Sequence, residues 1–103
     1  MQYSLHIENF QLSDADRDLL DKKLERLEKR LQTPYTTDVH FSHDTHHNRG
    51  DTVRCTINIE QGKKLLHAER TRETAQDALD EVLEALGKEL EKQKSKDKAA
   101  RRD

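Results

Sequence analysis

The chain has 103 residues, of which 39% are charged and 31% hydrophobic, and its formal net charge is −2. This length fits one domain, which can bury roughly 60–70% of the surface of the unfolded chain. The near-neutral balance argues against indiscriminate nucleic-acid binding, so such a function depends on how the charges are distributed. One cysteine, Cys55, cannot form an internal disulfide, and there is no signal peptide or long apolar run. The sequence predicts a soluble cytoplasmic protein that does not enter membranes.

A strand and a helix are expected first. Residues 2–8 alternate strictly between apolar and polar side chains, which is typical of a half-buried strand. Ser13 can cap the following helix, and Pro34 is expected to end it. Leucines at helical spacing form its inward stripe. They are Leu20, Leu24, Leu27 and Leu31.

Three further strands are expected, at about 37–43, 53–60 and 63–70. A polar loop at 43–50 separates the first two, and Gln61–Gly62 supplies a tight turn before the third.

Thr71 can cap the last helix. Its inward stripe is Ala75, Leu79, Val82, Leu83, Leu86 and Leu90. From Glu91 onward only two alanines are apolar, so we expect the helix to fray beyond about Lys92. The predicted organisation is a folded domain at 1–94 with a basic, flexible tail at 95–103.

The order of these elements, β-α-β-β-β-α, predicts an α+β fold. A right-handed crossover makes the first two strands parallel, and the next two hairpin back and forth. Each helix then runs opposite to the strand before it. We therefore expect two parallel helices on one face of a four-stranded sheet, in the architecture of double-stranded-RNA-binding domains, with a polar open face.

Both predicted helices begin acidic and end basic. Residues 13–21 carry four acids and one base, whereas 22–31 carry five bases and two acids. Likewise 73–84 carry five acids and no base, whereas 85–103 carry seven bases and four acids. The helix dipole favours such a bias, but capping does not need so many bases. Parallel helices would bring both basic ends to one pole, suited to phosphate.

The charges of the first helix are also sorted sideways. Lys22, Arg26 and Lys29 lie opposite the leucine stripe, and Lys23 and Arg30 lie on one flank. The opposite flank is acidic. Its members are Asp14, Asp18, Asp21, Glu25 and Glu28. The simpler interpretation is a solvated helix crossed by ion pairs, whereas acids and bases on different sides favour a phosphate-binding edge.

Neither a metal site nor a catalytic site is predicted. His6 and His40 should lie side by side on the open sheet face, but His67 is about 10 Å away at the usual strand spacing. His43, His46 and His47 share the polar loop without an ordered ligand pattern. Cys55 sits in an inward register, where a buried thiol is inert. No cofactor, small-molecule substrate or enzymatic activity is expected.

Three segments resemble the ribosome hibernation promoting factor family. Lys22–Lys29 is similar to the basic end of that family's first helix, and Ala75–Asp80 with Leu86–Lys92 is similar to its second helix. Thr56–Asn58 before the glycine turn also fits. Gly87 departs from the pattern and should loosen its helix by about 1 kcal/mol relative to alanine.

The resemblance implies a factor that binds the small ribosomal subunit through ribosomal RNA near the decoding site. There it would block mRNA and tRNA, inhibit translation under stress, and be monomeric off the ribosome. Without the second domain of long members, the chain resembles a short form. The RNA-binding residues carried over are Lys23, Arg26, Lys29, Lys88 and Lys92. Placement at the same ends adds Lys22, Arg30, Lys94 and Lys96.

Other functions are less favoured. The main alternative is a regulatory protein-interaction module, like a sigma-factor modulator, that uses the open polar sheet face. Double-stranded-RNA binding would need bases at the start of the last helix, where the chain has the acids of 73–84. A small enzyme is the weakest alternative, because no convergent site is visible.

Overall fold

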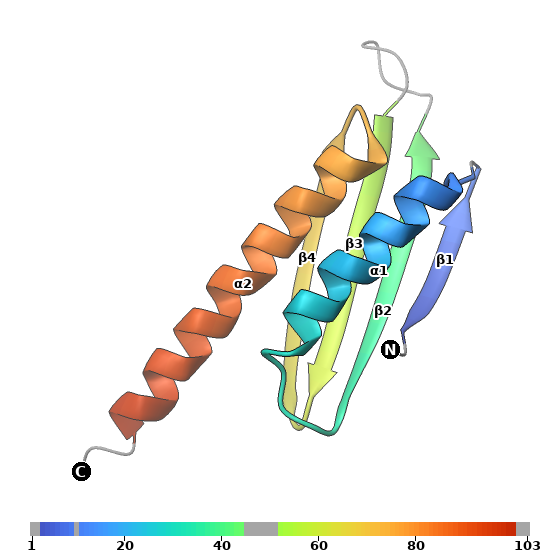
Figure 1. Cartoon of the computed structure of the whole chain (residues 1–103). Helices are drawn as coiled ribbons and strands as arrows, with labels where there is room; N and C mark the ends of the chain where they lie inside the picture. The colour runs from blue at the N-terminus through green and yellow to red at the C-terminus, as the bar shows by residue number, and fades with distance from the viewer. Residues whose placement is uncertain (1–2, 10, 45–51, 101–103) are drawn as a thin grey trace.

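The computed structural model describes residues 3–9, 11–44 and 52–100, with only the backbone for 44 and 93–100. The elements follow the predicted order. They are β1 (Ser4–Glu8), α1 (Asp14–Glu28), β2 (Tyr35–Asp44), β3 (Thr52–Gln61), β4 (Lys64–Arg72) and α2 (Ala75–Ala100). The expected α+β fold is confirmed: the four strands lie in the order β1-β2-β3-β4, and both helices cover one face (Figure 1).

Pairing within the sheet also matches the prediction. β1 pairs with β2 in parallel, and the pairs β2–β3 and β3–β4 are antiparallel. The turn between β3 and β4 contains Gly62 at φ 62°, which glycine adopts without steric cost.

The core lies between the helices and the inward side chains of the sheet. Leu20 and Leu24 of α1 and Val82 and Leu86 of α2 are almost completely buried. They pack over the inward residues of the central strands, which are Val39, Phe41, Cys55, Ile57 and Ile59. Each such side chain contributes about 1.5–3 kcal/mol through removal from water. The alternation in the sequence therefore identified the buried face correctly.

The ends of the helices differ in part from the prediction. Ser13 caps α1 as expected, and its Oγ accepts the backbone N–H of Asp16 at 3.1 Å. However, α1 ends at Glu28, well before Pro34. The N–H groups of Arg30 and Leu31 donate to the carbonyl oxygens three residues earlier, of Leu27 and Glu28, so the α-helical pattern does not continue. Lys29 and Arg30 thus follow the helix and are not part of it.

The predicted cap of α2 is wrong. Thr74 accepts the backbone N–H of Asp77 at 3.1 Å, whereas Thr71 lies in β4, paired with Arg54. β4 extends to Arg72, because Arg72 pairs with Val53 of β3 and the Glu81 carboxylate of α2 binds the Arg72 guanidinium.

The predicted loop at 43–50 also needs correction, because His43 lies in β2 and not in a loop. The remainder of the predicted loop, 45–50, lies outside the described residues.

Candidate nucleic-acid interface

Polar contacts at regular intervals join the two helices side by side. Gln76 Nε2 donates to Asp16 Oδ1 at 2.8 Å, across 60 positions of sequence. Lys23 binds the Asp80 carboxylate, across 57 positions. Because residues later in α1 contact residues later in α2, the helices run parallel, as Figure 1 also shows. The expected meeting of their basic C-terminal ends at one pole is confirmed.

Two of the predicted RNA-binding bases point toward the other helix. The Lys23 side chain is 26% exposed and is engaged by Asp80. Arg30 donates from Nη2 to the carbonyl oxygen of Gly87 at 3.3 Å and lies 3.9 Å from Glu91. Lys23 and Arg30 therefore connect α1 to α2, and RNA would have to compete with these contacts.

The other bases near the end of α1 face solvent. Lys22, Arg26 and Lys29 are exposed, and none of them makes an ion pair with another described residue. This placement follows from helix geometry, because they lie on the side away from Leu20, Leu24 and Leu27. Their charges can meet phosphate without breaking a contact within the protein.

The bases of α2 lie beyond the seam between the helices. Lys88 is 71% exposed and 3.5 Å from Glu84, and Lys92 is 72% exposed and 3.8 Å from Glu89. Exposed ion pairs of this kind contribute about 0–1 kcal/mol to the free energy of unfolding, so a phosphate can replace either carboxylate. With Arg70 they line a hollow between α2 and β4, which Glu81, Glu84 and Glu89 also line. Lys94 and Lys96 fall on the part of α2 described by its backbone alone.

The pole is therefore divided. Solvent-facing bases of α1 lie on one side, and Lys88 and Lys92 lie on the other. Between them lies the seam, where Arg30 contacts Gly87 and Glu91. This division was not visible in the sequence, because it depends on how the two helices are rotated against each other.

The acidic flank of α1 has partners that sequence reasoning missed. The hydroxyl of Tyr3 donates to the Asp21 carboxylate. Glu28 is 8% exposed and lies beside Tyr35 at the start of β2. Asp21 and Glu28 therefore rest against the edge of the sheet, whereas Asp14, Asp18 and Glu25 are exposed.

The open face of the sheet carries cross-strand polar pairs. His6 and His40 are directly paired between β1 and β2, with ring centroids 6.2 Å apart, as expected. On β3 and β4, His67 contacts Asn58, and Thr56 donates to Glu69 at 2.9 Å. Within the described residues, no three His, Cys, Asp or Glu side chains are grouped in a way that could hold a metal ion. Cys55 is fully buried, and burial raises the pKa of its thiol to about 12.

A family model provides the decisive comparison. It describes sigma 54 modulation protein / S30EA ribosomal protein, and it matches residues 3–98. The chain belongs to this family. The assignment agrees with the resemblance of the two helices to hibernation promoting factors.

Two solved structures of similar shape are the N-terminal domain of Thermus thermophilus Protein Y and a ribosomal subunit interface protein from Coxiella burnetii. The first has 22% identity and a TM-score of 0.71, and the match covers 89% of this chain and 98% of that one. The second has 18% identity and a TM-score of 0.74, covering 92% and 99%. At this identity they support the fold of the S30EA chain.

No helix in the described part of the S30EA chain is long and apolar enough to cross a bilayer. The family match extends to residue 98 and α2 to Ala100, whereas the predicted domain ended at 94. The division into a domain and a flexible tail stays a prediction.

Proposed function

We propose that this S30EA-family chain is a non-catalytic hibernation factor that binds ribosomal RNA of the small subunit near the decoding site. There it blocks mRNA and tRNA and keeps idle ribosomes inactive under stress. The observation that carries the proposal is the parallel arrangement of α1 and α2, which gathers basic side chains at one pole. Family membership and the description of the Coxiella neighbour as a ribosomal subunit interface protein support the ribosome as the partner.

Different bases have different parts in this proposal. Lys22, Arg26 and Lys29 contact phosphate directly, because they are exposed and carry no ion pair with described residues. Lys88 and Lys92 exchange weak intrahelical pairs for phosphate. Lys23 and Arg30 hold α1 against α2 and thereby set the spacing between the two groups. Lys94 and Lys96 would lengthen the basic surface along α2.

The proposal has further parts that follow from ribosome binding. The protein works in the cytoplasm, where small subunits are found, and is a monomer off the ribosome. It needs no cofactor or small-molecule substrate, since recognition by phosphate contacts requires only fixed positive charge.

Sedimentation of lysates from growing and starved cells tests the biological setting. We expect the protein to move with the ribosome fractions after starvation and to return to the top of the gradient during growth. A pool that stays at the top of the gradient in both states would contradict hibernation.

Chemical footprinting on purified small subunits tests the location. The protein should protect rRNA nucleotides around the decoding site, and a saturating mRNA with tRNA should remove that protection. Protection that is elsewhere, or that survives mRNA and tRNA, would place the protein outside the channel.

The alternative remains a regulatory module that uses the open sheet face. The cross-strand pairs His6–His40 and Asn58–His67 favour it, because they order polar side chains on that face. Substitution of His40 and His67 by Gln separates the two functions. Loss of ribosome binding in this variant would move the ribosome contact to the sheet face, whereas the proposal above expects binding to be retained.

A further inference from the structure

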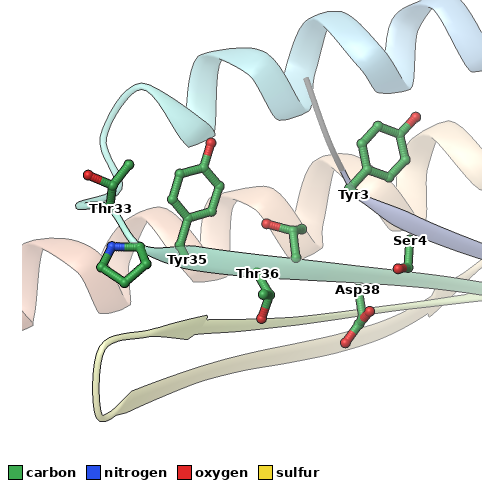
Figure 2. Close-up of a pocket in the computed structure, with 8 residues that line it drawn as sticks. Tyr3, Ser4, Thr33, Tyr35, Thr36 and Asp38 are labelled. Carbon is green, nitrogen blue, oxygen red and sulfur yellow. The ribbon is translucent and has the colours of Figure 1, made fainter.

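A hollow at the β1–β2 edge holds both tyrosines of the chain. Tyr3 precedes β1 and Tyr35 begins β2, and the chain has no other tyrosine and no tryptophan. Figure 2 shows both rings rising from the sheet toward α1, whereas Ser4, Thr36 and Asp38 point to the opposite face. The remaining described residues that line the hollow are Thr33, Pro34 and Thr37. We call this hollow the tyrosine pocket.

Two buried polar groups lie beside the tyrosine pocket. Thr37, which lines it, is 3% exposed, and its hydroxyl has no hydrogen-bond partner among the described residues. Glu28 is 8% exposed, and the Tyr35 hydroxyl lies against its carboxylate. Native proteins pair such groups, because burying them without partners is costly.

Glu28 stands behind the two aromatic rings. The Tyr35 hydroxyl lies close enough to the Glu28 carboxylate for that contact to raise the pKa of Tyr35. Burial and the bond to Asp21 raise the pKa of Tyr3, and the charge of Glu28 adds to the effect while Arg17 opposes it. Both rings therefore lie within the field of one buried carboxylate.

The surroundings of the tyrosine pocket are acidic. No lysine, arginine or histidine is among its described lining residues. At 100° per residue, Asp21 points about 200° away from Lys23, which binds Asp80 of α2, so the pocket is on the side of α1 that faces away from α2. Phosphate is repelled here, whereas a cation is attracted. Aromatic faces and a carboxylate together are a suitable environment for guanidinium.

We propose that the tyrosine pocket binds an arginine side chain of a basic peptide, separately from the nucleic-acid interface. The Tyr3 and Tyr35 rings contact the guanidinium, and the Glu28 carboxylate behind them attracts it. The partner is thus a protein segment that carries arginine, and the protein gains a protein contact beside its RNA contact.

Tyrosine fluorescence can report this binding directly, since both fluorophores lie in the tyrosine pocket. The probe is the capped tripeptide acetyl-Gly-Arg-Gly-amide, and its matched control has citrulline in place of arginine. We expect a saturable change with the arginine peptide and affinity at least about tenfold lower for the neutral citrulline peptide. Equal responses to both peptides would overturn the proposal.

Matched variants separate the pocket from general attraction to the acidic flank. Glu28→Gln should lower arginine-peptide affinity about tenfold or more, whereas Thr37→Val removes a hydroxyl that the peptide does not reach and should preserve it. Glu25→Gln removes the same charge from an exposed position on the same flank and should preserve affinity. Equal losses of peptide affinity in Glu25→Gln and Glu28→Gln would show that the charge of the acidic flank alone attracts the peptide. That result would contradict a defined pocket.

NMR on the free protein locates the bound peptide independently of variant folding. Amide shifts should centre on Tyr3, Tyr35 and Thr37, and a short RNA oligonucleotide should not compete for them. Shifts confined to the open sheet face, or displacement by the oligonucleotide, would overturn the proposal. Neither result bears on ribosome binding, which is measured with ribosomal subunits.

Discussion

The guanidinium of Arg30 lies directly on the backbone of Gly87: Nη2 is 3.3 Å from the Gly87 carbonyl oxygen. A Cβ placed on Gly87 would lie 3.1 Å from Arg30 Nη1, which is tighter than most such contacts. Glycine inside a helix costs about 1 kcal/mol relative to alanine. The contact gives a physical reason for accepting that cost, since the missing side chain lets Arg30 reach α2.

The Gly87→Ala variant should be more stable than the parent by up to about 1 kcal/mol, because the close neighbour is the mobile tip of a side chain that can move aside. For a domain of this size, that corresponds to a thermal midpoint about 4–8 °C higher. Calorimetry checks it. A lower midpoint would mean that the Arg30 contact contributes more than helix propensity.

Gly62→Ala is the matched control. Gly62 has φ 62° and open space around its Cβ position, so alanine there meets only backbone strain. We expect a loss of about 1 kcal/mol in the free energy of unfolding.

A second prediction concerns the salt dependence of ribosome binding. Replacing Arg26, Lys29, Lys88 and Lys92 by Gln should weaken binding and flatten the slope of log affinity against log salt by about 0.7–0.9 per lost phosphate contact. The thermal midpoint should barely change, because these charges are exposed. Binding to purified small subunits across a salt series measures it.

Two control variants are compared with that result. Replacing Lys23 and Arg30 by Gln should lower the thermal midpoint more, because it removes contacts between α1 and α2. Replacing His40, His43, His46 and His47 should alter neither the slope nor the midpoint. If histidine variants lost binding while the basic variants kept it, a site on the histidines would have to replace the proposed interface.

Much of the fold could be predicted because local sequence patterns determine it. Strict alternation in 53–60 identified Cys55, Ile57 and Ile59 as inward, and crossover handedness then required parallel helices. The sequence predicted Thr71 as the cap of the last helix, whereas Thr74 caps it. Pairing of Arg72 with Val53, which is a tertiary contact, decided between them.

The candidate site could be predicted only as a set of charges. Helical spacing placed Arg26 and Lys29 on the solvent side correctly. It could not reveal that Arg30 bonds to Gly87, or that Tyr3 bonds to Asp21, because these contacts depend on how distant elements cross. The tyrosine pocket was missed for the same reason.

Cys55 should make the protein sensitive to alkali. Its thiol pKa is raised from 9.0 to about 12 by burial, so the unfolded chain loses this proton first. The resulting stabilisation is complete below pH 9 and is lost as the pH rises toward 12, by up to about 1.4 kcal/mol per pH unit. Urea unfolding at pH 7 and pH 10 should show this fall, and Cys55→Ala should reduce it. An equal fall in Cys55→Ala would assign the effect to the tyrosines.

Tyr3→Phe should lower the free energy of unfolding by about 1–2 kcal/mol, because it removes the hydrogen bond to the Asp21 carboxylate and keeps the ring. The double-mutant cycle with Asp21→Asn isolates the pair. Additive effects of the two substitutions would show that the bond contributes nothing to stability.

Glu28→Gln should raise the free energy of unfolding by about 1–2 kcal/mol, because it replaces a buried charge by a neutral amide of the same shape that can still accept from Tyr35. Glu25→Gln, at an exposed position, should change it by no more than about 0.5 kcal/mol. Chemical denaturation measures both. A more stable Glu28→Gln variant that also loses arginine-peptide binding would show that the carboxylate is kept for binding at a cost in stability. A destabilised variant would instead show that Glu28 holds α1 to β2, with Tyr35 as its structural partner.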